Sequence, residues 1–416
     1  MQRYRDIIGH IQYGLFLTVV ALLPFPQLWL RYACVLWFVT WVLEGRWLGK
    51  PSAFSRQPSA ISLPFIIFGL WYAWKIVSGL WAPDQVAWGR TIERLLTCGL
   101  LVPVGIWGLN ERYDWHQVGR VLVISCLCAA LFYPMLLSVL LYYPQLLNIL
   151  NWQAPWDYSN LDWLTFYAAN LSHIKHRLFL SSVEMLGGIV ACQQLGHQWR
   201  RLLPTLLVIG LCVLMTGSRQ VIITGAILLV IGAIYALPQR VRQRYGMPII
   251  LCGLILGGGL LYMHPRMQDF SLNGINEIRH LSYYHDLRFN VWGAALQHPS
   301  DYLWTGLGAG QATTYLNTQF EQHGMHNYIL FVTHCHNQYL QELVESGLVG
   351  LLLFVLAWIA LLLGAKRKGR LTAILFTILF ALNMLTDCMF ASFCGVALWA
   401  VGLVLILLQS DAQRQE

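Results

Sequence analysis

The chain has 416 residues, of which 57% are hydrophobic and only 11% are charged, and its mean hydropathy is +0.54. A soluble domain carries about 25% charged residues, so this composition excludes an ordinary soluble enzyme and predicts a polytopic α-helical membrane protein. The formal net charge of +8 fits a basic excess on cytoplasmic loops more simply than it fits nucleic-acid binding.

The hydropathy pattern predicts about twelve membrane spans, with roughly 17–25 residues as the length of a span. Two connections between them are long, residues 143–177 and 264–337, and the last spans occupy 338–409. We therefore expect an all-α protein with a single integral membrane domain over 1–416. The predicted spans centre near 11–29, 31–45, 61–80, 91–109, 118–142, 178–196, 202–217, 219–237, 247–263, 338–364, 371–388 and 393–409.

The ten cysteines lie mostly inside apolar runs and form no CxxC pair, so they are expected to be small packing residues. Lys and Arg are enriched in cytoplasmic loops, and most of the 27 basic residues fall in one set of connections that includes both termini. We therefore expect both termini in the cytoplasm and both long loops on the opposite face, the periplasm of a Gram-negative cell.

The other basic residues lie where this rule disfavours cations. Some are expected to snorkel to lipid headgroups, whereas an excess of arginine on this face also indicates a bound anion, because a planar guanidinium suits phosphate. Arg177 is one candidate for substrate binding. The set comprises Arg31, Lys75, Arg90, Arg94, Lys175, Arg177, Arg219, Arg266, Arg279 and Arg288.

Arg219 lies in the segment MTGSRQVIITGAI, where one predicted span ends at the outer face and the next begins. Ser218 can cap the new helix, whose N-terminus carries the positive end of the helix dipole. An arginine beside such an end is a candidate phosphate ligand. The alternative is an anchor to lipid headgroups.

Arg279 and Arg288 lie in the middle of the second long loop. Pro299 marks the end of a predicted amphipathic helix on the membrane surface, whose apolar residues recur at helical spacing. Arg288 can either stack on an aromatic ring four residues away or grip a lipid-linked phosphate, and Arg279 is a second candidate for substrate binding. The apolar residues are Leu287, Val291, Trp292 and Ala295.

The glycine-rich stretch WTGLGAGQ follows, with Gly306, Gly308 and Gly310. It predicts a turn that lets the loop fold back over the helix bundle. A nest of amides that binds an anion is the alternative. A dinucleotide-binding motif is excluded because the stretch does not lie between a strand and a helix.

The segment HCHNQYLQELVESG, residues 334–347, precedes the apolar run LVGLLLFVLAWIALLLG. Asn337 is expected to cap a helix with His336 at its outer lip. At about 100° per residue, Tyr339 shares the face of His336 and is a candidate for substrate binding with Asn337. Glu342 and Glu345 lie on the opposite face and are expected to hold the bundle together. His336 is the predicted general base, because imidazole titrates near neutral pH.

Asp387, in NMLTDCMFASF, is expected at the outer face, where it can orient the histidine, bind a sugar hydroxyl or pair with an arginine. The sequence leaves these roles open. Zinc is a second possibility at the histidine-rich segment, but no carboxylate cluster suits Mg²⁺, and we favour a site without metal or other cofactor. The potential zinc ligands are His323, His326, His334, Cys335 and His336.

At these residues the sequence resembles the O-antigen ligase (WaaL) family, within the Wzy_C superfamily of polytopic polysaccharide enzymes. HNQYLQELVESGLVGLLLF is similar to that family's H-N-x-x-L-x-x-x-x-E-x-G-x-x-G signature. TGSR before a span, and an arginine-bearing outer loop that ends in G-x-G, are similar too. The resemblance covers about 200 C-terminal residues in its motifs, and the whole chain in the number of spans and the layout of the loops.

The resemblance implies a GT-C-like glycosyltransferase of the inner membrane. It implies transfer of a glycan from undecaprenyl diphosphate to a sugar hydroxyl of lipid A–core, on the periplasmic side and without metal. His336 would be the base-like residue, and Arg219 and Arg288 the diphosphate ligands. Related protein O-oligosaccharyltransferases usually carry a C-terminal soluble domain, whereas this chain ends in QSDAQRQE after its last predicted span, which favours a lipid ligase.

Two alternatives stay open from the sequence. An O-antigen polymerase would use the same donor with a second lipid-linked glycan as acceptor. A transporter would bind an anionic headgroup and perform no chemistry, but its paired broken helices and related halves are not evident.

Overall fold

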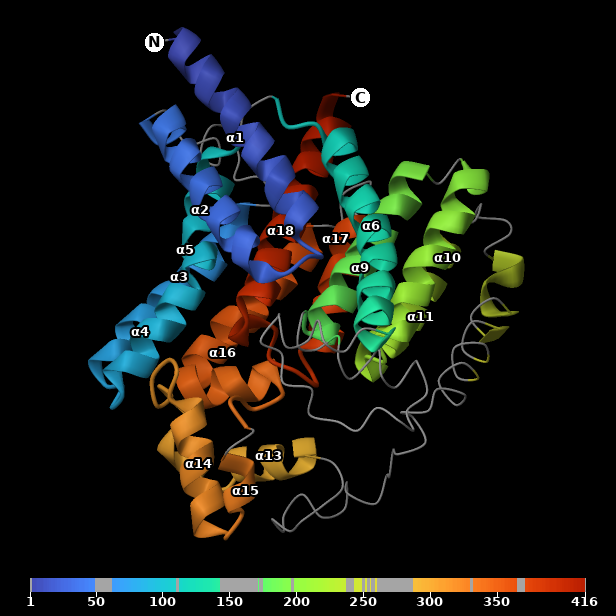
Figure 1. Cartoon of the computed structure of the whole chain (residues 1–416). Coiled ribbons are helices and arrows are strands. Elements are labelled where there is room, and N and C mark those ends of the chain that lie inside the picture. Colours follow the sequence, from blue (N-terminus) through green and yellow to red (C-terminus); the bar gives the residue numbers. More distant parts are fainter. Residues whose placement is uncertain are drawn as a thin grey trace. The chain divides into compact units, whose positions relative to one another are not determined.

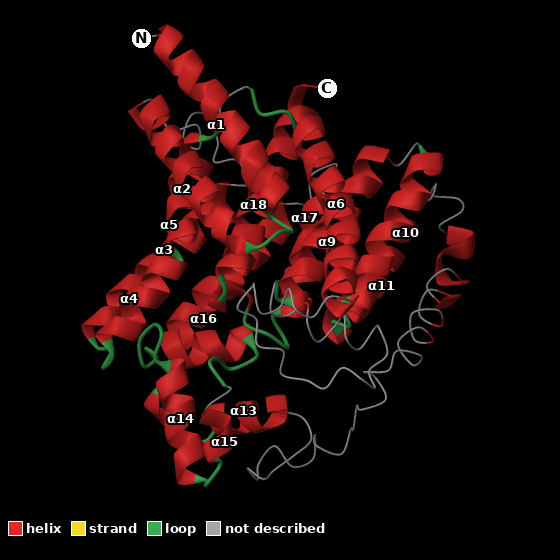
Figure 2. Cartoon of the chain, viewed as in Figure 1, coloured by secondary structure: helices red, strands yellow, loops and turns green. Residues whose placement is uncertain are grey.

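A computed structural model describes residues 2–48, 62–109, 112–142, 171, 175–195, 198–236, 243–248, 251–252, 255, 259, 287–329, 332–364 and 371–415. Helices and loops make up this described part, and it contains no strand (Figure 2). The prediction of an all-α protein is confirmed for these residues. The main helices are α1 (Gln2–Leu22), α2 (Gln27–Glu44), α3 (Ser62–Val77), α4 (Gln85–Arg94), α5 (Leu96–Trp107), α6 (Trp115–Tyr142), α9 (Arg177–Leu195), α10 (Trp199–Met215), α11 (Arg219–Ala236), α13 (Leu287–Ala295), α14 (Ala312–Gln322), α15 (His326–Ile329), α16 (Gln338–Gly364), α17 (Leu371–Asn383) and α18 (Phe393–Gln415).

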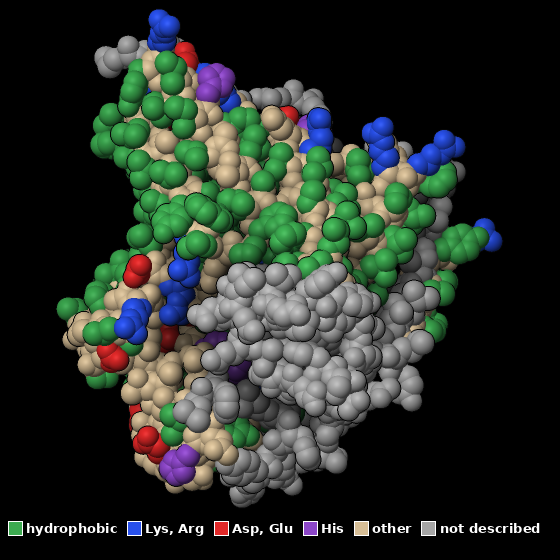
Figure 3. All heavy atoms as spheres, viewed as in Figure 1, with side chains coloured by type: hydrophobic (Ala, Val, Ile, Leu, Met, Phe, Trp, Pro, Cys, Tyr) green, Lys and Arg blue, Asp and Glu red, His purple; other side chains and the backbone are tan. Residues whose placement is uncertain are grey.

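Several of these helices are apolar on the outside as well as the inside, as expected of an integral membrane protein. Four are long and apolar enough to cross a membrane, at Leu63–Leu80, Trp115–Val139, Arg177–Leu195 and Gln338–Gly364. Large hydrophobic side chains are exposed along the helices, and they cover much of the surface drawn in Figure 3. The full set of twelve spans stays a prediction, and much of the predicted span 247–263 falls outside the described residues.

The chain divides into two compact units. The first comprises Met1–Tyr13, Leu36–Tyr113 and Phe270–Glu416, and the second comprises Gly14–Val35 and Asp114–Asp269. In the first unit α3 packs against α5 and α16, and in the second α9 packs against α6, α10 and α11. The single integral membrane domain over 1–416 stays a prediction.

The predicted span 91–109 is wrong in its first part. Asp84 caps a separate helix, α4, by accepting hydrogen bonds from the backbone N–H groups of Val86 and Ala87. The chain leaves helical geometry at Leu95, where ψ is 0°, and α5 then begins at Leu96. The charged residues at the end of α4 therefore belong to a short amphipathic helix and not to the apolar span.

α16 is not the straight helix that the sequence predicted, because it breaks at Gly347 (Figure 1). This residue has φ 63° and ψ −168°, a conformation that only glycine adopts without strain. The loop before α14 bridges the break: Leu307 N donates to Val344 O at 2.9 Å, and Leu348 N donates to Leu303 O at 2.7 Å. The polar N-terminal segment of α16 therefore runs in a different direction from the apolar segment after Gly347.

The glycine-rich stretch makes this bridging possible by close backbone approach. Gly306 and Gly308 have φ values of 74° and 105°, and a Cβ on Gly306 would lie 2.3 Å from the carbonyl carbon of Glu345. Gly308 N donates to Glu345 O at 3.0 Å, and Ala309 N donates to Ser78 Oγ at 2.9 Å. The predicted turn is confirmed, and since these amides already bind protein groups, the alternative of an anion-binding nest is not supported.

α13 buries its apolar side in protein, so the expectation that this face lies on a membrane is wrong. Together with α14, α15 and the loop that follows, it forms a small hydrophobic core that also includes Val344 of α16. The core reaches the segment between the two histidines of HCH at Cys335. Its buried members are Val291, Ala294, Ala295, Tyr302, Ala312, Tyr315, Leu316, Phe320, Met325, Tyr328, Val332, Cys335, Val344 and Cys388.

We predict that Gly347→Ala destabilises the protein, because its Cβ would lie 2.3 Å from Trp304 O at a positive φ. The expected loss is about 1–3 kcal/mol, measured as a lower melting temperature in detergent. Gly14→Ala is the matched control, since Gly14 lies in helix α1 with open space around its Cβ position. Equal melting temperatures for the two variants would contradict the role of the break.

Candidate active site

The helix that opens the candidate site is capped as predicted. Asn337 Oδ1 accepts hydrogen bonds from Tyr339 N at 2.9 Å and from Leu340 N at 3.1 Å. Directly before this cap, His336 has φ 48° and is the only described residue other than glycine with a positive φ. Such a conformation costs on the order of 1–3 kcal/mol and is typical of functional sites. The backbone therefore holds His336 in one particular orientation at the helix mouth.

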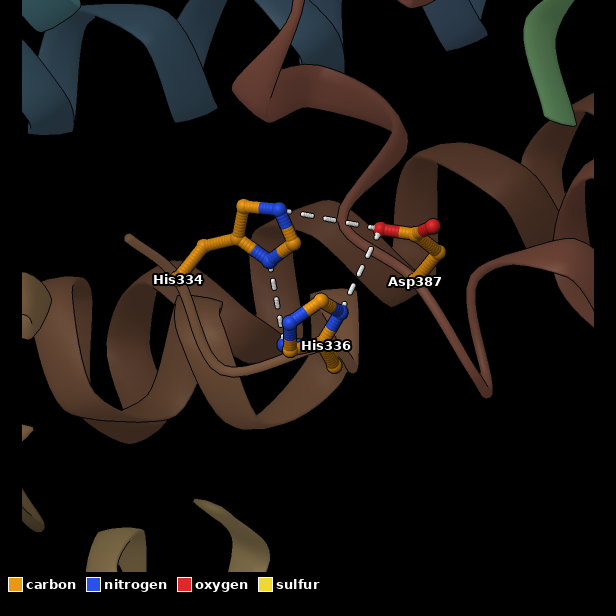
Figure 4. Close-up of side chains that lie close together, drawn as sticks. All are labelled: His334, His336 and Asp387. Atoms are coloured by element: carbon orange, nitrogen blue, oxygen red, sulfur yellow. Dashed lines mark hydrogen bonds and ion pairs between the residues drawn. The ribbon is translucent and has the colours of Figure 1, made fainter. Parts of the chain in front are cut away.

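Asp387 lies beside both histidines of HCH, as Figure 4 shows. Its Oδ1 is 3.8 Å from His334 Nε2 and 4.0 Å from His336 Nδ1. The two imidazole rings are also close to each other, with centroids 4.3 Å apart. The sequence left several roles open for Asp387. Its position beside the histidines fits the role of orienting them, and it forms no ion pair with an arginine among the described residues.

The hydrogen bonding of His334 fixes where its proton lies. His336 N donates to His334 Nδ1 at 3.2 Å, so Nδ1 carries the lone pair and the proton of the neutral ring is on Nε2, facing Asp387. Burial lowers the pKa of His334, and the nearby Arg94 cation lowers it further, although Asp387 acts in the opposite direction. We therefore expect His334 to be neutral at neutral pH, with its Nε2 3.8 Å from Asp387 Oδ1.

The same three side chains are the described group that best resembles a metal site, since their ligand atoms all lie within 4.8 Å of one another. A metal would need the lone pair of His334 Nε2, yet the hydrogen bond to Nδ1 leaves a proton on that atom. Metal-bound histidines normally donate their other ring N–H to an acceptor, which is the opposite arrangement. His323 is not in the group, and its Nδ1 lies 2.8 Å from Gln319 O. These donors fit a metal ion poorly as they are arranged.

Two glutamines of α16 hold the loops that carry these side chains. Gln341 Oε1 accepts a hydrogen bond from Cys335 N, between the two histidines, at 2.9 Å. Gln338 Oε1 accepts one from Phe390 N, three residues after Asp387, also at 2.9 Å. The amide nitrogens of both glutamines point into the helix bundle and donate to the glutamates four residues further on. The sequence pattern did not identify either glutamine as a positioning residue.

Lys75 of α3 completes this chain of polar contacts. Its Nζ lies 3.0 Å from Glu342 Oε2 and 2.8 Å from Glu345 Oε2, and all three side chains are at most 5% exposed. Trp71 Nε1 also donates to Glu342, at 2.9 Å. The expectation that the two glutamates hold the bundle together is confirmed. The expectation that Lys75 snorkels or binds an anion is wrong, because a buried cation needs a carboxylate partner and finds two.

The remaining candidates are distributed over both units. Arg288 lies half-buried in α13 of the first unit, and Arg279 falls outside the described residues. Tyr339 is half-buried, and its hydroxyl donates to Ala381 O at 3.2 Å, which is a structural contact with α17. Arg177 and Arg219 are the first residues of α9 and α11 in the second unit, where helix dipoles favour an anion. Their substrate roles stay predictions.

We predict that Lys75→Met lowers the free energy of unfolding by about 3–5 kcal/mol, because it leaves two buried carboxylates without a cation. Arg112→Met is the control: Arg112 pairs with Asp6 at 2.8 Å, but their side chains are 30% and 52% exposed. Its loss should stay within about 1 kcal/mol. Adding Glu342→Gln and Glu345→Gln to Lys75→Met should recover part of the stability. Equal losses for the two single variants in denaturant titrations would contradict this role of Lys75.

Comparison with known proteins supports the sequence resemblance. Residues 204–355 match the family model Wzy_C, described as O-antigen ligase. These residues contain TGSR, the glycine-rich turn and the HCHNQYL segment with its capped helix. A search of curated proteins finds no match to the chain. Over these residues the chain is therefore similar to the O-antigen ligase (Wzy_C) family.

Proposed function

We propose that this protein is an O-antigen ligase of the bacterial inner membrane. It transfers a glycan from undecaprenyl diphosphate to a sugar hydroxyl of lipid A–core on the periplasmic face, without metal or other cofactor and with both termini in the cytoplasm. The observation that carries the proposal is the pair of His336 and Asp387, held at the mouth of a capped helix within the residues that match the family.

In the proposed reaction His336 acts as general base. The acceptor hydroxyl oxygen attacks the anomeric carbon, its proton passes to His336, and the bond from that carbon to the diphosphate oxygen breaks. The diphosphate leaves with the bonding electrons. When His336 Nδ1 bears a proton, it faces Asp387 at 4.0 Å and Nε2 is left to accept the hydroxyl proton. Catalytic hydrogen bonds are often long before substrate binds, so this distance suits an orienting carboxylate.

A single displacement with inversion fits the surrounding carboxylates. A retaining mechanism needs a carboxylate nucleophile at the anomeric carbon. Glu342 and Glu345 are buried and engaged by Lys75, and Asp387 lies against the two histidines. No other carboxylate belongs to the described histidine cluster. The direct attack of the acceptor hydroxyl is therefore the simplest chemistry that these residues support.

The diphosphate leaving group requires positive charge, which arginines can supply in place of a metal ion. We assign Arg219 and Arg288 to this role, with Arg177 and Arg279 as further substrate ligands. Asn337 and Tyr339 complete the proposed binding residues at the helix mouth. Planar guanidinium groups bind phosphate oxygens in pairs, which fixes the donor as well as neutralising it.

The polymerase alternative shares the donor and the same base, and differs only in using a second lipid-linked glycan as acceptor. The matched family covers both activities. The similarity of the HNQYL signature to ligases favours the ligase. A transporter would not need a base paired with an orienting carboxylate.

We predict that His336→Ala lowers transfer by about 10²–10⁴-fold, the usual contribution of a general base. The assay mixes purified protein with undecaprenyl-diphosphate glycan and either lipid A–core or a second donor molecule as acceptor, with and without EDTA. His323→Ala is the control, since His323 follows α14 in the same histidine-rich part of the sequence but does not belong to the histidine cluster. It should transfer like the wild type.

Product on lipid A–core that survives EDTA and needs His336 would support the ligase. Chain growth on the second glycan alone would replace it with the polymerase. Loss of product on chelation would overturn the metal-independent mechanism, and full activity in His336→Ala would exclude this residue as the base.

A further inference from the structure

The end of α4 carries two arginines on one face that have no acidic partner. Arg90 and Arg94 are separated by four residues, the spacing at which side chains of a helix meet. Like charges at this spacing repel each other. Neither forms an ion pair among the described residues, although Glu93 lies on the same helix. A local salt bridge therefore does not account for this cationic face.

Arg94 is fixed against the segment that carries Asp387. Its Nη1 donates to Ala391 O at 2.9 Å, in the short 3₁₀ turn Met389–Ala391 that follows Asp387. Gln338 holds the middle of the same turn through Phe390 N. Arg94 thus helps to hold the turn that follows Asp387, although it lies 297 residues before Ala391 in the chain.

The guanidinium of Arg94 is half-buried and uses one of its five N–H donors in that contact. Its charge reaches the cluster, where it disfavours protonation of His334. A half-buried guanidinium beside this cluster can bind an anionic group through its remaining N–H donors. In Figure 3 histidine side chains lie set back beside a group of basic side chains on the drawn face.

A purely structural role explains less. Holding the Ala391 carbonyl needs one hydrogen-bond donor, which a neutral glutamine also provides. It needs neither a permanent charge nor a planar group with several donors. The chemistry of the site does need both, because the bond that breaks leaves negative charge on a phosphate oxygen.

We propose that Arg94 binds a phosphate of the lipid-linked diphosphate donor and stabilises its charge as it leaves. The proposal rests on the proposed function and adds a diphosphate ligand from α4, within the same compact unit as His336 and Asp387. Arg94 takes no part in proton transfer, and its Ala391 contact orients the guanidinium toward the donor.

The test measures donor binding and catalysis separately in Arg94→Gln and Arg94→Lys. Arg90→Gln is the matched control, because Arg90 is exposed on the same face of α4 and forms no hydrogen bond or ion pair within the described part of the chain. Undecaprenyl diphosphate is titrated against each protein in neutral phosphatidylcholine nanodiscs, and KM and kcat are determined for donor and acceptor. Melting temperature reports on folding.

We expect Arg94→Gln to weaken binding of undecaprenyl diphosphate at least tenfold and to raise the KM for the donor. The KM for the acceptor and the melting temperature should stay near the wild-type values. Arg94→Lys should recover part of the binding, because it keeps the charge but not the planar fork. In histidine-selective NMR, Arg94→Gln should raise the pKa of His334, since it removes a neighbouring cation.

Wild-type donor binding by Arg94→Gln would overturn the proposal, whether or not transfer falls. A matching fall in melting temperature and donor binding, with no recovery in Arg94→Lys, would assign Arg94 a structural role instead. A second arm replaces the donor with phosphatidylglycerol in the nanodiscs. Equal, Arg94-dependent binding of this lipid would identify a general headgroup site and overturn donor recognition.

The binding arm does not depend on the acceptor or on turnover. If the wild type binds the donor through Arg94 but transfers nothing to lipid A–core, the proposed ligase fails while the anion site stands. If His336→Ala abolishes transfer and Arg94→Gln still binds the donor normally, the ligase stands and the Arg94 proposal fails.

Discussion

The structure around the candidate site depends on one buried cation, Lys75, held between two buried carboxylates. Glu342 and Glu345 each face Lys75 with one oxygen, and each accepts a glutamine amide with the other. Because these groups lie in a dry interior, an unpaired member would be far more costly than the same group at the surface. The triad therefore specifies how α3 and α16 pair, and the two glutamines that contact the site extend from this pairing.

The glutamines that donate to these glutamates also accept hydrogen bonds from the backbone of the site. Gln341 fixes the peptide between the two histidines, and Gln338 fixes the turn after Asp387. The break at Gly347 lets this polar segment depart from the direction of the apolar run, and the glycine-rich turn satisfies the backbone groups exposed there. The loop that carries His336 is thus held by a glutamine of α16 at Cys335, and such support is what precise positioning requires.

The features that the sequence predicted correctly depend on residues close together in the chain. Hydropathy located most helices, the position of Asn337 before an apolar run indicated the cap, and helical spacing separated the face of His336 from that of Glu342 and Glu345. The partner of Lys75 lies 270 residues away at Glu345, so no local pattern could assign it. A signal was nevertheless present, because one lysine and two glutamates inside apolar segments must find partners.

The errors have similar causes. The apolar character of residues 91–109 hid the change of helix at Leu95, and a helix break at Gly347 depends on contacts with residues 303–308 that periodicity does not encode. A helix was correctly expected at α13, but an apolar spacing does not distinguish a membrane surface from the protein core that covers this helix. For Asp387, spacing left several roles open, and only the fold brought it beside His336.

The central claim is that the imidazole of His336, oriented at the helix mouth, takes the acceptor proton. Chemical rescue of His336→Gly by free imidazole tests it most directly, because glycine tolerates the φ of 48° at this position and leaves the space of the ring empty. We expect transfer to return as the concentration of neutral imidazole rises, while donor binding equals that of the wild type. A variant that binds the donor normally and melts like the wild type, yet gains no activity from imidazole at any pH, would contradict it.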